Sequence, residues 1–283
     1  MATSSAGRSP LASAPDVNGD GKPDVKNILD RVDQLHKDGV IFDESAPMGH
    51  IPVRGRKGRY PMVCIDLIYV AYRAAGYDLL SAMTGGPLFK KDAPPPRGAG
   101  GLRLVTRLLA FVKKSPHFHY YDGPDLNLAA HPKWRPRTPF RVGDMLLIHY
   151  DDNADRHSGI VTGVDPNTGL PTYITQVSIY TATEGMHRST LDEFFSVVDR
   201  RLTGWARPAL WDQAPMSAEE RALTVPLPPE PPRPTFYPGG AFEDIHARAR
   251  ARLASGRAAR LGERSPAAPG SPTGPAPGRG ATP

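Results

Sequence analysis

Apolar residues recur at helical spacing in three stretches of the N-terminal half of the chain. In residues 25–38 and again in residues 102–114, apolar side chains fall three or four positions apart on one face. Residues 63–76 are apolar around most of their circumference and end at a glycine, which indicates a buried helix. The pattern therefore predicts three helices, with an irregular segment over residues 40–62.

The period of the pattern changes after Pro139. Short apolar runs separated by turn residues such as Asp, Asn and Gly are typical of strands joined in hairpins. Such runs cover residues 145–150, 157–164 and 173–180, and two further elements are expected at residues 191–199 and 202–206. Because the helices come first and an antiparallel meander follows, the sequence predicts an α+β fold. We expect the N-terminal helices to pack on a small antiparallel sheet.

Proline divides the chain into a globular part and a tail. The chain has 283 residues and 32 prolines, 14 of which lie in residues 213–283. This segment is Pro-rich and Ala/Arg-rich, so we expect a disordered tail that is dispensable for folding. Residues 1–24 are expected to form a disordered N-terminal segment, and residues 25–212 a single folded domain.

Charge and hydropathy narrow the classes of partner. The formal net charge is +6, and the sequence shows neither zinc-finger spacing nor a helix-turn-helix signal, so no specific nucleic acid partner is expected. The sequence contains no run of about 18 apolar residues, so no transmembrane segment is expected. The N-terminus lacks the apolar core of a signal peptide, so the protein is expected in the cytoplasm or exported by a non-obvious route. The sequence gives no indication of oligomeric state.

Residues 16–24 resemble the start of a calcium-binding loop. Oxygen-bearing side chains occupy its positions 1, 3, 5 and 9, namely Asp16, Asn18, Asp20 and Asp24, and a glycine occupies position 6. The twelfth position, however, is Asn27 instead of the glutamate that would bind bidentately. Two interpretations stay open: a weak Ca²⁺ site, or a solvated turn that caps the following helix.

Cys64 is the only cysteine in the chain, which excludes an intrachain disulfide. It could fill the core as a small apolar residue, serve as a redox thiol, or act as a nucleophile. Pro61 prevents an earlier helix start, so Cys64 is expected in the first turn of the apolar helix. Free N–H groups and the helix dipole favour a thiolate there, which predicts a lowered thiol pKa. Asp66 is interpreted as the cap of this helix.

His157 is the candidate base for such a nucleophile. It opens a predicted strand and is followed by Ser158 and Gly159, and the glycine is expected to leave room for a substrate beside the imidazole. The alternative is an exposed turn histidine. A thiol and an imidazole, each at the boundary of an element, are the groups that thiol nucleophilic catalysis requires.

These motifs together resemble the NlpC-like cysteine hydrolases, and most closely a bacterial domain-of-unknown-function branch with a V-C-T-D and H-x-G-I-V signature. The matching segments are Val63-Cys64-Ile65-Asp66, Tyr72-Arg73-Ala74, Val142-Gly143-Asp144 and His157-Ser158-Gly159-Ile160-Val161. Ile65 replaces the threonine of this signature, and Ser158 replaces an isoleucine. The resemblance covers about residues 40–208.

The resemblance implies a papain-like fold and a cysteine peptidase or amidase that acts on peptide or peptidoglycan-type substrates without a required cofactor. It also implies a third polar residue on the strand after the histidine strand. Gln176 stands there, where it would orient the imidazole, although it could also be a solvent-facing strand residue. Two other functions remain open: an acyl hydrolase or transferase for another substrate, and a non-catalytic binding module of the same fold.

Overall fold

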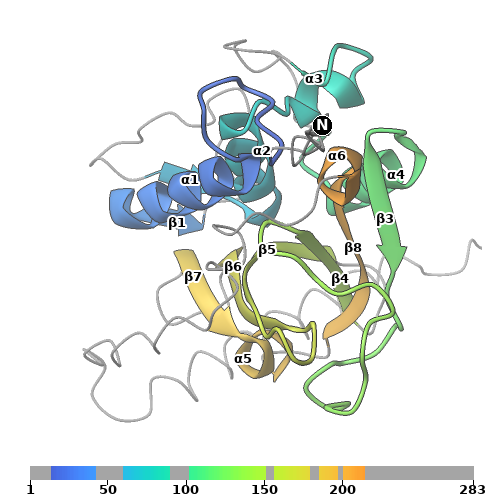
Figure 1. Cartoon of the computed structure of the whole chain (residues 1–283). Coiled ribbons are helices and arrows are strands. Elements are labelled where there is room, and N and C mark those ends of the chain that lie inside the picture. Colours follow the sequence, from blue (N-terminus) through green and yellow to red (C-terminus); the bar gives the residue numbers. More distant parts are fainter. Residues whose placement is uncertain are drawn as a thin grey trace, which may run out of the picture.

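The computed structural model describes residues 14–42, 60–89, 102–150, 156–178, 185–196 and 200–213. These residues form a mixed α+β domain in which a curled eight-stranded sheet packs against helices (Figure 1). The α+β prediction is therefore confirmed. The segments expected to be disordered, residues 1–24 and 213–283, lie outside the described residues except for positions 14–24 and 213.

Each of the three predicted helices is present, and three short helices accompany them within the described ranges. The helices are α1 (Asp24–Asp38), α2 (Cys64–Ala74), α3 (Leu79–Met83), α4 (Val105–Lys114), α5 (Leu191–Ser196) and α6 (Ala209–Gln213). Helix α1 follows Pro23 and ends at Gly39, whose φ of 77° lies in the left-handed region that glycine adopts without strain. Proline before the helix and glycine after it thus set its length.

The sheet is larger than the predicted meander. Its strands are β1 (Val40–Phe42), β2 (Tyr60–Met62), β3 (Phe118–Asp122), β4 (Met145–Tyr150), β5 (Arg156–Val164), β6 (Pro171–Ser178), β7 (Gly185–Thr190) and β8 (Arg200–Pro208). They lie in the order β2-β1-β7-β6-β5-β4-β8-β3. All neighbours are antiparallel except β1 and β2, which are parallel.

Two sequence predictions about this sheet are wrong. The segment 40–62 is not irregular at its ends, because β1 and β2 lie there, and the sheet is not purely antiparallel. Each of these strands has three residues, which is too short to leave a period in the sequence. The two strands pair with each other although 17 residues (43–59) separate them along the chain, so only the tertiary structure reveals them.

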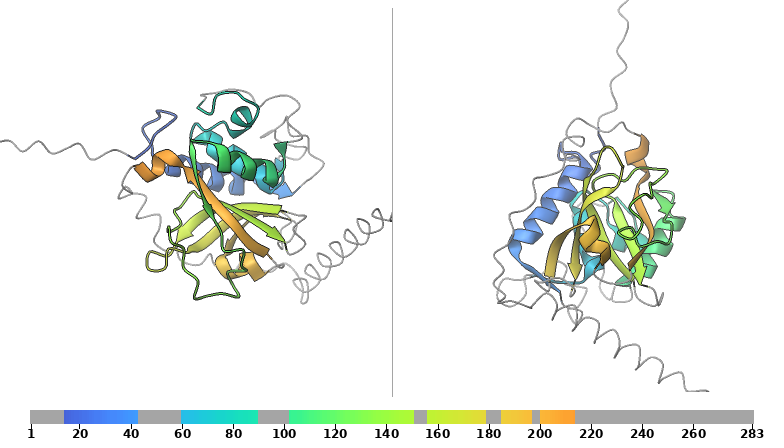
Figure 2. Two further views of the ribbon diagram at one scale, coloured as in Figure 1. Left: turned by 90° about the vertical axis from the view of Figure 1, so that its right-hand side faces the viewer. Right: turned by 90° about the horizontal axis from the view of Figure 1, so that it is seen from below.

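The helices cover both faces of the sheet. Helices α1, α2 and α4 lie on one side and α5 on the other in the views of Figures 1 and 2. Helix α2 contacts β5 and β6, and α5 contacts β6, β7 and β8. Strand β4 is buried along its whole length, as expected for a strand covered on both faces. The centre of the sheet is therefore the place where α2 and β5 meet.

Strands β5 and β6 are paired only along part of their length. Their ladder ends at Ile160 and Thr175, so the start of β5 and the end of β6 continue beyond it. Side chains can bridge the two strands at this end. Among the described helices, none has both the length and the apolar composition needed to cross a membrane.

Candidate functional site

Cys64 is the first residue of α2, as predicted. Val63 precedes it in an extended conformation, with φ −110° and ψ 173°, so the chain enters the helix directly at the thiol. The N–H of Val63 donates to Oδ2 of Asp66 over 2.9 Å. The interpretation of Asp66 as the helix cap is confirmed, since its carboxylate accepts an N–H that the helix cannot satisfy.

A buried ion pair holds this cap in place. Asp66 is completely buried, and Nη2 of Arg103 lies 2.6 Å from its Oδ2. Burial raises the pKa of Asp66, and the hydrogen bonds and charge of Arg103 and the N–H of Val63 oppose this rise. Arg103 was not among the predicted site residues. It precedes α4 and anchors the start of α2 from 37 positions away.

The environment of the thiol differs from the prediction. Burial raises the pKa of Cys64, and the nearby carboxylate of Asp66 raises it further. The side chain and backbone of Ser158 and the backbone of Ile65 favour the thiolate but do not outweigh desolvation. The direction of this shift contradicts the predicted low thiol pKa. The physical reason is that the desolvation of the thiolate is more unfavourable than its hydrogen bonds at the start of α2 are favourable.

His157 is buried, and its ring bonds to Gln176. Its Nε2 lies 2.7 Å from Oε1 of Gln176, and its ring stands 5.9 Å from the ring of Phe194 on α5. Burial lowers the pKa of His157 to about 3, and the charge of Arg200 adds to this, while Gln176 opposes it. The alternatives of an exposed turn histidine and a solvent-facing Gln176 are both wrong, because the two side chains are 5% and 0% exposed.

The structure brings Cys64 to the strand that carries His157 but does not join the two by a hydrogen bond. The thiol lies against Ser158, the chain neighbour of His157. Ser158 Oγ is fully buried and has no hydrogen-bond partner of good geometry among the described residues. Consecutive side chains of a strand project to opposite faces. The thiol is on the Ser158 side, and the imidazole packs with α5.

Two further residues complete the surroundings of Gln176. Its Nε2 donates to Oγ of Ser189 on β7 over 2.9 Å, and Nη1 of Arg200 donates to its Oε1 over 3.2 Å. Neither residue was predicted. In the sequence, Arg200 and Arg201 are two consecutive arginines with no local sign of burial. Only the knowledge that they lie in a strand, where successive side chains face opposite sides, would have indicated that one of them points inward.

Gly159 has a different role from the one expected. A Cβ at this position would stand 2.7 Å from Cγ2 of Ile174 and 3.0 Å from the carbonyl oxygen of Thr175. The absence of a side chain thus allows β6 and α5 to approach β5 closely. It does not leave room for a substrate.

The side chains of the calcium-like loop accept hydrogen bonds from backbone N–H groups of the same loop. Asp16 accepts the N–H of Asp20 and of Gly21, over 3.1 and 2.8 Å, and Asp20 accepts the N–H of Lys22 over 2.9 Å. Asn18 contributes an acceptor to Asp20 as well. These bonds are those of the solvated turn that the second interpretation expected. The capping part of that interpretation is wrong, because the N-cap of α1 is Pro23 and no side chain bonds there.

Asp24 is buried, and its carboxylate bonds both to the core and to the backbone of the loop. Its Oδ2 accepts the hydroxyl of Tyr77 over 2.5 Å and Nε1 of Trp211 over 3.2 Å, and its Oδ1 accepts the N–H of Val17. Within the described ranges, no three His, Cys, Asp or Glu side chains gather as a metal site. A donor set that lacks Asp24 fits calcium poorly. Calcium binding by this loop stays a prediction.

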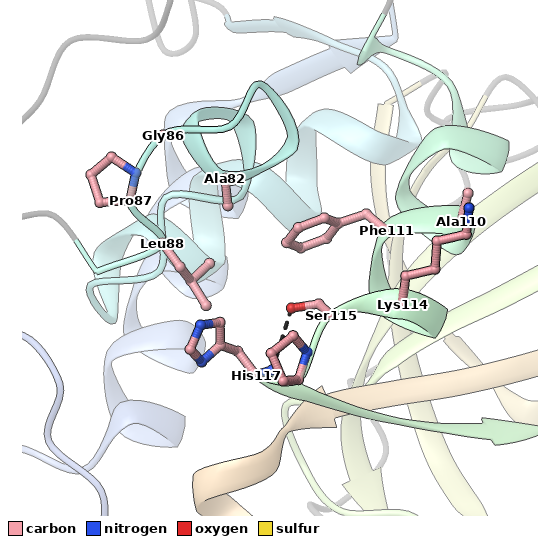
Figure 3. Close-up of a pocket in the computed structure, with 10 residues that line it drawn as sticks. Ala82, Gly86, Pro87, Leu88, Ala110, Phe111, Lys114, Ser115 and His117 are labelled. Carbon is pink, nitrogen blue, oxygen red and sulfur yellow. Dashed lines mark hydrogen bonds between the residues drawn. The ribbon is translucent and has the colours of Figure 1, made fainter.

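A cavity of about 470 Å³ opens elsewhere in the domain. Its walls include Leu88, Phe111, Lys114 and His117, and it lies between the α3 region and the end of α4 (Figure 3). The chain segment with Leu88 bonds to Asp78, beyond the C-terminal end of α2. Cys64 begins this 11-residue helix, which is about 16 Å long. None of the candidate residues lines this cavity.

Comparisons with known proteins add no assignment to this geometry. No protein-family model matches the sequence, and no curated protein or solved structure is significantly similar to it.

Proposed function

We propose that this protein is a cysteine-nucleophile amide hydrolase with a papain-like fold of the NlpC type, in which Cys64 attacks, His157 is the base and Gln176 orients the imidazole. The observation that carries the proposal is the buried 2.7 Å bond between His157 Nε2 and Gln176 Oε1. It stands at the start of β5, where Ser158 contacts the only thiol of the chain. A histidine with an amide acceptor and a thiol at a helix start are the parts of a thiol-hydrolase site, although here the imidazole and the thiol lie on opposite faces of β5.

The pKa directions support a neutral resting pair. A thiol with a raised pKa and an imidazole with a lowered pKa do not exchange a proton at rest. Proton transfer from Sγ to the Nδ1 of His157 would instead accompany attack on the amide carbon, so that His157 acts as a general base. Since Gln176 engages Nε2, Nδ1 is the ring nitrogen left for this step. To bring Nδ1 within hydrogen-bond reach of Sγ, the imidazole must turn from the α5 face of β5 toward the start of α2.

The bonds formed and broken then follow in order. Sγ bonds to the amide carbon, and the free N–H groups at the start of α2 stabilise the oxyanion. The amine leaves with the proton that His157 received, and a thioester remains. Water, deprotonated by His157, attacks this thioester, releases the acid and returns the proton to the thiol. No metal or organic cofactor enters the sequence of steps.

The substrate class follows from the sequence resemblance alone. It points to the peptide stems of bacterial cell wall, whose amide bonds this chemistry would cleave. The substrate class and the catalytic roles of the three residues stand or fall with the reactivity of Cys64.

Alkylation by iodoacetamide tests the proposal because the chain has one thiol. We expect folded protein to label at pH 7, and His157→Ala to label at least about tenfold more slowly, since it removes the base. Cys64→Ser is the blank, and equal labelling of both proteins in denaturant shows that only the folded environment differs. Equal rates in the two folded proteins, or labelling that requires denaturation, would contradict the proposal.

One observation favours a second candidate, a non-catalytic binding module of the same fold. The Cys64 thiol has a raised pKa and makes no hydrogen bond to His157. A binding module predicts an unreactive thiol and an unchanged ligand affinity in Cys64→Ser. A hydrolase predicts loss of amide cleavage in Cys64→Ser and in His157→Ala, with the fold intact.

A further inference from the structure

Arg200, the first residue of β8, is a buried cation with an unusual set of neighbours. Its side chain is 0% exposed, and its guanidinium lies 4.6 Å from the ring centre of Phe194. Nη1 donates to Oε1 of Gln176 over 3.2 Å and to the carbonyl of Phe194 over 2.7 Å. No carboxylate of the described residues forms an ion pair with it. Burying a charge without a carboxylate partner is unfavourable, so the contacts that this guanidinium makes call for an explanation beyond packing.

The contact with Arg200 determines which way the amide of Gln176 points. A guanidinium carries only donors, so the amide atom that faces it must be the oxygen Oε1. Ser189 Oγ, on the other side of the amide, can donate or accept and would tolerate either orientation. Of the two partners, only Arg200 therefore excludes the flipped amide.

The orientation of the amide in turn determines the tautomer of His157. The same Oε1 lies 2.7 Å from Nε2 of the imidazole, and an amide oxygen can only accept. Nε2 must therefore carry the ring proton, and in the neutral ring the lone pair is on Nδ1. A flipped amide would present Nε2–H of Gln176 instead, and the ring would carry its proton on Nδ1, where it could not accept one from a thiol.

We propose that Arg200 is a positioning residue of this site: it locks the Gln176 amide and thereby holds His157 as the Nε2–H tautomer that a base for Cys64 requires. This inference rests on the proposed function for its meaning, although the tautomer itself can be measured without a substrate. The positive charge of Arg200 acts in the same sense, because it disfavours protonation of the nearby imidazole.

Nitrogen chemical shifts of the His157 ring in ¹⁵N-labelled full-length protein test the proposal. In the wild type we expect a single Nε2–H tautomer that stays neutral from pH 7 to pH 5. In Arg200→Met, we expect a mixture of tautomers and an upward shift of the His157 titration by at least about one pH unit, since both the donor and the charge are lost. Arg200→Lys keeps a donor-only cation and should restore the single tautomer.

Arg201 provides the matched control. It is the next residue of β8, and its Nη1 donates to the carbonyl of Asp125 instead of to Gln176. Arg201→Met removes the same charge from the chain and should leave the His157 tautomer and titration unchanged. If Arg200 had only a structural role, Arg200→Met would be less stable, but its His157 tautomer and titration would match those of Arg201→Met.

Two results would overturn the inference. A wild-type ring in the Nδ1–H form refutes it without any variant, which keeps the test decisive even where Arg200→Met does not fold. A folded Arg200→Met whose ring stays entirely Nε2–H and titrates as in the wild type also refutes it. If Cys64 labelling still depends on His157 in that case, the hydrolase proposal stands and only the role of Arg200 falls.

Discussion

The buried state of His157 predicts a specific pH dependence of stability. In the folded protein its pKa is lowered to about 3, whereas an unfolded chain has a histidine pKa of about 6.5. Between these values the unfolded chain binds a proton that the folded protein does not. The contribution of His157 to stability is therefore fully present above pH 6.5 and is lost progressively as the pH falls toward 3.

The magnitude follows from the two pKa values. Each pH unit in this window removes about 1.4 kcal/mol, so stability should fall by about 2 kcal/mol between pH 7 and pH 5 from His157 alone. Other buried groups contribute slopes of their own. Asp144, whose pKa burial raises to about 6, contributes in the opposite sense, since its stabilisation is lost as the pH rises through 6. The pH dependence of the unfolding free energy of the wild type is thus the sum of the contributions of all these groups.

The difference between wild type and His157→Gln isolates the effect, because the other groups cancel in it. Urea unfolding of both proteins at pH 7 and pH 5 should show a wild-type loss that exceeds the variant's loss by about 2 kcal/mol. His117→Gln, which removes an exposed histidine, is the matched control and should follow the wild type. A gap between wild type and His157→Gln that does not change with pH would refute the reasoning.

Three other changes test separate parts of the structure. Asp66→Asn leaves the largely buried guanidinium of Arg103 without its carboxylate and should destabilise the fold by about 3–5 kcal/mol in urea, against about 0.5 kcal/mol or less for Asp30→Asn at the half-exposed pair with Lys26. Gly159→Ala places a methyl group 2.7 Å from Cγ2 of Ile174 and should cost about 1–3 kcal/mol; an unchanged urea midpoint would show that β6 can retreat. Calorimetry should find no calcium affinity tighter than about 10⁻⁵ M, because Asn27 replaces the bidentate glutamate; sub-micromolar binding would contradict this.

The sequence predicted the elements whose signals are local. Apolar periodicity located α1, α2 and α4, and turn residues located β4, β5 and β6. Cys64 was placed correctly at the start of its helix for the same reason. Strands β1, β2, β3 and β7 escaped prediction, since a short strand acquires its conformation from the partners it pairs with.

The contact between His157 and Gln176 was also accessible from the sequence. Both lie in neighbouring antiparallel strands joined by a hairpin, so their proximity depends on a short loop and a register. The sequence resemblance then indicated which polar residue of the second strand to choose. What it did not indicate was the burial of both side chains, which changes the charge state expected for the imidazole.

The sequence by itself determined the order of the main helices and of strands β4 to β6, and the position of the only thiol at a helix start, while the resemblance supplied the pairing of His157 with Gln176. The tertiary structure decided the rest: the Arg103–Asp66 pair, the buried guanidinium of Arg200 at Gln176, and the raised pKa of Cys64. The reason is physical. Periodicity and turn chemistry act over a few residues, whereas desolvation and charge pairing depend on which remote segments exclude water from a group, and no local pattern encodes that.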